Sequence, residues 1–361
     1  LGVLGVRQDA FQDVDASSLF VGRVTANVLQ ESSLGMIVTD GDPNSNDDNS
    51  VFGVDFYYLN TRLANGRSVD GNLWYEVSDT SGLYGENAAF GVSTSANTTE
   101  GLGGFVSYKA VEKNFRPALG FVSRLGIRHL EYSLHYIYRP TNSWLRAVQT
   151  RVFVDRFERL ADGGLESEAV TLQPIQLENH TGDDFQINFT AHKEGLIEPF
   201  DVSDGVTIPI GDYQFDRVEM QFNTGGQRRF SGGLAYEAGD FYDGESLSLR
   251  PYFNWRPSEH FRLNVEYRMD DVDLPHGSFV TRLARIRTDI VFSSRFSWVN
   301  LFQWDNVSNT LGINSRLHWI PQAGREAYLV LNHNMRDIDG RRTFRSDTAE
   351  FTAKINYTFR F

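Results

Sequence analysis

The sequence predicts an all-β protein, and three observations favour a membrane-spanning barrel. Apolar and polar residues alternate with a period of two along most of the chain, whereas helical periodicity is almost absent. The alternating segments run for about ten residues, the length that a tilted strand needs to cross the hydrocarbon core. Tight and long connections also alternate. We therefore expect one domain over residues 1–361, a single closed antiparallel transmembrane barrel of about 20 strands (range about 18–22), with short periplasmic turns and long extracellular loops.

Composition excludes several other classes of protein. The formal net charge of −13 argues against a nucleic-acid partner, which requires clustered Lys and Arg. The chain has no Cys, so it has no disulfide framework, thiolate nucleophile or Cys-based zinc site. Aromatic residues reach 13%, and mean hydropathy is −0.37. No run approaches the roughly 18 apolar residues of a membrane helix.

The strand pattern is clearest in four segments. Each places aromatic and aliphatic residues on one face and charged or hydroxyl residues on the other: 129–138, 246–255, 260–269 and 351–361. Two tight turns, YRPTNSW (138–144) and WRPSEHF (255–261), share an aromatic–Arg–Pro–hydroxyl pattern. Pro presets φ for a turn, and the flanking rings suit a membrane interface. The spacing predicts long external loops that include 237–246 and 270–278.

The polar face of the strands is predicted to line a lumen. Its charged members are Arg250, Arg262, Glu266, Arg268, Arg285, Arg287, Asp289, Arg316 and Lys354. They fit either a filter for solutes or an Arg–carboxylate network that stiffens the wall. A lumen enclosed by about 20 strands is too wide for wall side chains to fill. The segments 111–127 and 195–212 are therefore the candidate plugs or lids.

The last strand carries a candidate assembly signal. The final residues INYTFRF place four apolar side chains on one face: Ile355, Tyr357, Phe359 and Phe361. This pattern resembles the signal read by the outer-membrane barrel assembly machinery, whereas the alternative is that a strand ends in Phe by chance.

A second resemblance covers essentially the whole chain. The stretches NFRPALGFVSRLGIR, LENHTGDDFQINFT, GDYQFDR and SWVNLFQWDNVSNTLGINSRLHWIPQAGREAYLVLNHN, among others, resemble a bacterial outer-membrane family of poorly defined function. Its members are similar to fusions of an N-terminal domain like the family-nine carbohydrate-binding modules with a large C-terminal barrel. The resemblance implies that this domain, together with about one barrel strand, lies upstream of Leu1 and that the chain is a processed or truncated product. It brings no catalytic residues.

The stretch DGDPNSNDDN (40–49) is the strongest candidate for a metal site. Its oxygen-bearing side chains recur at every second position: Asp40, Asp42, Asn44, Asn46 and Asp48. Such spacing can wrap a Ca²⁺ ion, but Ser45 and Val51 occupy the positions where a helix–loop–helix calcium loop needs Gly and Glu. A solvated loop tip is therefore the preferred reading, and no cofactor is expected beyond this possible Ca²⁺. Other predicted external loops are also acidic, through Asp9, Asp13, Asp15, Asp201, Asp204, Asp240, Asp243, Asp270, Asp271 and Asp273.

These features predict an outer-membrane channel or transport-type barrel in a Gram-negative bacterium, for saccharide-like or other small polar solutes. The expected partners are outer-membrane lipid, lipopolysaccharide, the assembly machinery and the solute. The alternative is a structural barrel, sealed by its loops, that displays a binding domain. An enzyme is not expected, since no GxSxG nucleophile motif appears; a barrel-embedded hydrolase is the third possibility.

Overall fold

Strands form nearly all of the protein. The computed structural model describes residues 1–338 and 343–358. Its strands are β1 (Gly2–Gln8), β2 (Ser17–Val28), β3 (Ser32–Asp40), β4 (Asn49–Asn60), β5 (Ser68–Thr80), β6 (Ala88–Asn97), β7 (Gly101–Val111), β8 (Ile127–Tyr138), β9 (Leu145–Arg159), β10 (Leu165–Asn179), β11 (Asp184–Leu196), β12 (Phe200–Ser203), β13 (Val206–Ile208), β14 (Gly211–Asn223), β15 (Phe230–Phe241), β16 (Gly244–Ser258), β17 (Phe261–Leu274), β18 (Gly277–Ser293), β19 (Phe296–Asp305), β20 (Thr310–Gln322), β21 (Arg325–Asp337) and β22 (Phe344–Tyr357). A single 3₁₀ turn, Ala64–Gly66, lies between β4 and β5. Within the described residues, no helix is long and apolar enough to cross a membrane.

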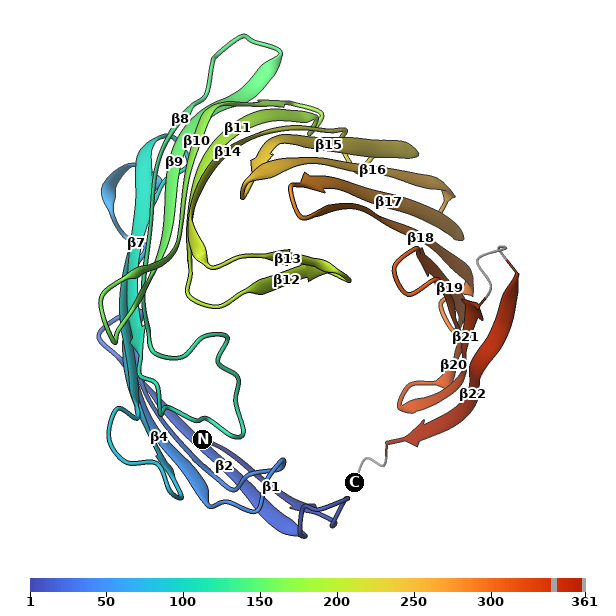
Figure 1. The fold of residues 1–361 in the computed structure, drawn as a ribbon. Helices are drawn as coiled ribbons and strands as arrows, with labels where there is room; N and C mark the ends of the chain where they lie inside the picture. The colour runs from blue at the N-terminus through green and yellow to red at the C-terminus, as the bar shows by residue number, and fades with distance from the viewer. Residues whose placement is uncertain (339–342, 359–361) are drawn as a thin grey trace.

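Twenty of the described strands form one large sheet, and β12 and β13 form a separate pair. Each strand of the large sheet pairs antiparallel with its neighbour along the chain, and β11 pairs with β14 past the small hairpin. Seen end-on, the sheet curves into a ring (Figure 1). This confirms an antiparallel all-β wall with the expected number of strands.

The ring differs from the prediction because it is not closed. Among the described residues, β1 pairs with β2 alone and β22 pairs with β21 alone. The two strands are the free edges of the sheet and face each other across the gap in the ring (Figure 1). The alternating pattern specifies strands and their faces, but it does not specify which edge meets which.

Two segments fold into the interior of the ring. One is the β12–β13 hairpin, and the other is the connection between β7 and β8, at 112–126 (Figure 1). Both belong to the stretches predicted as plugs or lids. The hairpin buries Val206 and Ile208 against Val272 and Leu274 of β17. The even-numbered side chains of β17 therefore point inward. Residues that lie opposite each other across a ladder point to the same face of the sheet. The pairing of successive strands therefore shows which side chains point inward on every strand of the wall.

The outward face is apolar across the middle of the strands. Along β8, Tyr132, Leu134 and Tyr136 are exposed on the outward face, whereas His129 and Ser133 on the inward face are buried. Exposed outward side chains recur on other strands, for example Leu102 of β7 at 55% and Leu73 of β5 at 58%. Soluble proteins rarely expose a continuous apolar surface of this kind. The wall thus has an apolar outer face, whereas its inner face combines polar and charged side chains with apolar ones such as Phe105 and Phe153.

Two of the predicted long loops are instead paired strands. The stretch 237–246 lies in β15 and β16 with a turn at 242–243, and 270–278 lies in β17 and β18 with a turn at 275–276. Asp240, Asp270, Asp271 and Asp273 are therefore strand residues, and Asp243 lies in a turn. Their acidity resembled that of a loop because these hairpins extend past the apolar band, where both faces of a strand meet water.

Candidate functional site: the charged inner face

The predicted lumen residues share one face of the wall. Across the β17–β18 ladder, Arg262 lies opposite Asp289 and Glu266 lies opposite Arg285. Arg262 and Glu266 are even-numbered residues of β17, as is Val272, which contacts the infolded hairpin. Their side chains therefore point to the interior as well. The same pairing rule places the remaining members on the inner face: Arg250, Arg268, Arg287, Arg316 and Lys354.

Arg250 is the centre of a network that spans three strands. Its guanidinium lies 2.9 Å from the carboxylate of Glu219 on β14 and 2.8 Å from that of Glu237 on β15. Arg217 contacts Glu237 at 3.0 Å, and the Asn188 amide donates to Glu219 at 2.9 Å. Sequence reasoning found Arg250 but not its partners, because the partners lie on other strands and become neighbours only through the register.

The other predicted charges divide into paired and unpaired groups. Arg285 contacts Glu266 at 3.3 Å, and Arg287 contacts Asp289 at 3.0 Å. Arg268 contacts Asp270 at 2.7 Å. In the described part of the chain, three predicted residues form no ion pair: Arg262, Arg316 and Lys354. The inner face therefore combines a network of ion pairs with cations that form none among the described residues.

Side-chain amides continue the polar surface across neighbouring strands. Gln173 of β10 donates to Gln186 of β11 at 2.9 Å, and Gln186 donates to Gln221 of β14 at 2.8 Å. Asn264 donates to Asn254 at 2.8 Å in the same manner. These bonds run from strand to strand and satisfy polar groups that would be costly to leave unpaired in the wall.

The infolded segment 112–126 is attached to the wall at both ends. Asn49 donates to the Arg116 carbonyl at 2.7 Å and accepts from the Ala118 amide at 3.2 Å. At the other end, Arg124 contacts Glu166 at 2.9 Å and stacks over the Phe157 ring, 4.1 Å from its centroid. The segment also buries Phe115, which is 2% exposed, against the wall.

The Asp-rich loop is held by its own hydrogen bonds. Asp42 accepts from the backbone amides of Asn44 and Ser45 at 2.7 and 3.2 Å, as turn-forming Asp residues do. Asn46 ties the loop to the neighbouring connection by accepting from the Asp15 amide at 2.8 Å. Asp40 is exposed at the end of β3.

The loop borders a recess of about 610 Å³ that Asp48 also lines. In residues 1–338 and 343–358, no group of three or more His, Cys, Asp or Glu side chains is placed to hold a metal ion. In the structure Asp42 forms a turn and Asn46 holds the neighbouring connection, and calcium binding at the loop stays a prediction.

The candidate assembly signal lies partly in the described structure. Ile355 and Tyr357 lie on β22, and Ile355 is 82% exposed on the outward face. Arg325 donates to the Tyr357 hydroxyl at 2.8 Å. Phe359 and Phe361 lie outside the described residues, so half of this prediction has no structural counterpart.

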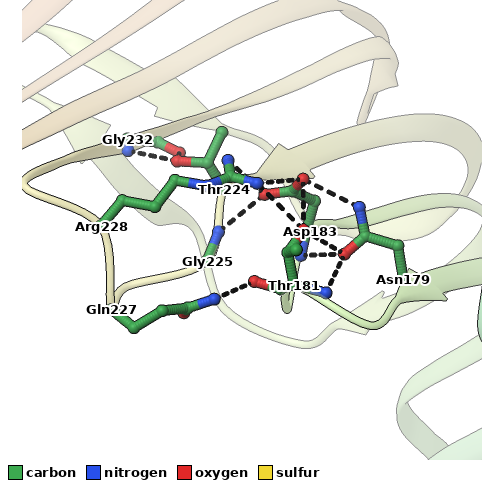
Figure 2. Close-up of polar contacts among 8 residues, drawn as sticks. All are labelled: Asn179, Thr181, Asp183, Thr224, Gly225, Gln227, Arg228 and Gly232. Atoms are coloured by element: carbon green, nitrogen blue, oxygen red, sulfur yellow. Dashed lines mark hydrogen bonds and ion pairs between the residues drawn. The ribbon is translucent and has the colours of Figure 1, made fainter.

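A polar clamp joins two turns at the end of the ring with the shorter connections (Figure 2). Arg228 reaches the Asp183 carboxylate with two contacts of 2.7 Å, and Gly225 donates to the same carboxylate at 2.9 Å. Asn179 and Thr181 add side-chain donors at 2.8 and 3.2 Å. The guanidinium, followed by these hydrogen bonds, holds the pKa of Asp183 well below its usual range.

Comparison with known proteins finds a likeness among solved structures but none among sequences. No family model and no curated protein matches the sequence. Among solved structures, the chain is similar to the FrpB iron transporter from Neisseria meningitidis (F3-3 variant), with a TM-score of 0.41 and 10% sequence identity. The match covers 88% of this chain and 61% of the transporter chain, so this chain spans about three fifths of that protein's length. The family resemblance described above stays a prediction.

Proposed function

We propose that the chain forms the wall of a barrel in the Gram-negative outer membrane and that the charged interior of this barrel passes small polar solutes. One observation carries the proposal: a ring of twenty described strands exposes apolar side chains outward and holds charged side chains inward. Hydrocarbon tolerates a spanning sheet of this kind when every backbone group is paired within the wall. Lipopolysaccharide around the apolar band and the assembly machinery at the last strand are the partners that this placement requires.

The side chains of the inner face favour a polar solute over an apolar one. The unpaired cations Arg262 and Arg316 and the amide ladder around Gln186 offer donors and acceptors along the wall. Hydroxyl-rich solutes fit such a surface because their many donors and acceptors can exchange water for side-chain amides one bond at a time. A saccharide is therefore the first solute class to test.

Single-channel recording tests the proposal. The purified chain is inserted into planar bilayers, and stepwise current at fixed voltage is the expected result. A variant that lacks 200–208 serves as the matched comparison, because the β12–β13 hairpin lies inside the ring (Figure 1). Larger steps in this variant are expected if the hairpin narrows the path. Silence from both proteins in membranes that contain the inserted chain would contradict a channel.

A specific observation favours a second candidate, a loop-sealed anchoring barrel. Both infolded segments are fixed by buried contacts, through Phe115 at 2% exposure and Ile208 at 1%. Side chains so completely buried are costly to move, as expected for a permanent seal rather than a moving lid. Stable insertion of the intact chain without any current is the outcome that selects this candidate.

A further inference from the structure

A group of charged side chains interrupts the apolar outer face of the wall, near the end of the ring with the longer connections. We call it the outer charged cluster; its members come from β8, β9, β10 and β11: Arg128, Arg156, Glu158, Glu168 and Lys193. Arg128 and the exposed Tyr132 are both even-numbered residues of β8, so their side chains point to the same face. The other four members point to that face as well, because each lies opposite another member across a ladder.

Ion pairs join the members of the outer charged cluster across the strands. Arg156 contacts Glu158 at 2.8 Å and Glu168 at 2.5 Å. Lys193 contacts Glu168 at 3.0 Å, whereas Arg128 lies 3.9 Å from Glu158. The side chains of the two carboxylates are 26% and 10% exposed, whereas those of Arg128, Arg156 and Lys193 are 42%, 37% and 48% exposed. The cations are thus the more accessible members, and they outnumber the carboxylates.

The outer face on the membrane side of the cluster is apolar. Exposed outward side chains follow on β8, β10 and β11 toward the middle of the strands: Tyr132, Leu134, Val170, Leu172 and Phe189. A lipid with an anionic head group matches this arrangement, because its head meets cations while its acyl chains lie on the apolar side chains. Guanidinium and ammonium groups bind phosphate oxygens through charge-assisted hydrogen bonds. The cluster therefore fits a phosphorylated lipid.

The outer face carries the opposite charge on another part of the same end of the ring. On β15, β16 and β17, outward carboxylates line a recess of about 510 Å³: Asp240, Glu245, Asp271 and Asp273. Like charges repel, so a phosphate group is disfavoured beside this recess. The charge distribution therefore favours an anionic lipid at β8–β11 over one at β15–β17.

We propose that the outer charged cluster binds the phosphate groups of one lipopolysaccharide molecule through Arg128, Arg156 and Lys193. Glu158 and Glu168 act as positioning residues, because their ion pairs hold Arg156 and Lys193 in place on the wall. The acyl chains of this lipid cover the apolar side chains of the same strands. The inference rests on the proposed function, because the outer membrane supplies the lipid.

Lipid A, the phosphorylated membrane anchor of lipopolysaccharide, is the probe, and native mass spectrometry of the purified chain in detergent measures its binding. The test variant is Arg128→Gln/Lys193→Gln, in which Arg156 keeps both of its carboxylate partners. Arg128→Lys/Lys193→Arg preserves both charges. Arg282→Gln is the matched control, because Arg282 is an exposed outward cation of β18, outside the cluster.

Phosphorylated lipid A should bind the parent protein, the charge-preserving variant and Arg282→Gln with similar affinity. We expect the test variant to bind it at least about tenfold more weakly, since each cation near an anionic lipid contributes roughly fivefold. The single change Arg128→Gln removes only the 3.9 Å contact and should lower the affinity by about fivefold, which keeps the test open if the double variant does not fold.

The proposal is overturned if Arg128→Gln and the folded test variant bind lipid A as the parent does, or if Arg282→Gln loses as much affinity as the test variant. It is also overturned if dephosphorylated lipid A binds the parent as tightly as the phosphorylated form. A chain that stays monodisperse in buffer without detergent would count against the proposed function. Binding of lipid A to a chain that passes no current would remove the channel and leave this inference standing.

Discussion

Replacement of Arg250 by Met should destabilise the wall measurably. Arg250 bonds two carboxylates, on Glu219 and Glu237, and the three side chains are 34%, 26% and 23% exposed. Removing one partner of a fully buried ion pair costs about 3–5 kcal/mol, whereas an exposed pair contributes about 0–1 kcal/mol. After the change, Glu219 keeps its hydrogen bond from the Asn188 amide, and Glu237 keeps its ion pair with Arg217. We therefore expect a loss of about 1–2 kcal/mol in the free energy of unfolding.

Urea unfolding in lipid vesicles, followed by tryptophan fluorescence, measures this loss. Arg262→Met is the matched control, because Arg262 lies on the same face, is exposed and forms no ion pair among the described residues. Its change should stay within about 0.5 kcal/mol. In the double variant Arg250→Met/Glu219→Gln, the two losses should fall short of additivity, since both remove one interaction. Equal effects of Arg250→Met and Arg262→Met would refute the network.

Three further predictions concern the Arg124 contacts of the infolded segment, the outward face and the clamp. Arg124→Met should free the end of the infolded segment, and limited proteolysis should then cut within 112–126 faster than in the parent protein. Leu134→Arg should cost about 2–4 kcal/mol of stability in vesicles, whereas His135→Arg, on the inward face, should cost far less. Because the pKa of Asp183 is depressed in the folded state, its ionised carboxylate stabilises the fold at any pH above the unfolded-state pKa of about 3.9. This stabilisation is lost as the pH falls toward the folded-state pKa. In the Asp183→Asn variant, the free energy of unfolding should therefore fall less steeply below about pH 4 than in the parent protein. An equally steep fall in both proteins would show that the clamp does not stabilise the fold.

The sequence predicted well whatever depends on local alternation. Arg285, Arg287 and Asp289 could be assigned to one face because side chains in a strand alternate strictly. The strand number followed from the same pattern. The infolding of 112–126 and of the β12–β13 hairpin was anticipated because long connections above a wide ring have an interior to occupy.

Features that depend on register or on the ring as a whole were not predictable. Glu219 and Glu237 become partners of Arg250 through the pairing of β14, β15 and β16, which no local pattern encodes. Acidic 270–278 was predicted to be a loop because its composition is that of a turn, although it forms the paired end of β17 and β18. The open edges at β1 and β22 belong to no single segment.

The central claim is that lipid lies against the apolar face of these strands while the charged face lines the interior. Single Cys residues introduced one at a time from Tyr132 to Tyr136 of β8, spin-labelled in vesicles, test it directly. Collisions with oxygen, which concentrates in hydrocarbon, should be frequent at 132, 134 and 136, and collisions with a water-soluble nickel chelate should be frequent at 133 and 135. A reversed alternation, or chelate access at every position, would contradict the account.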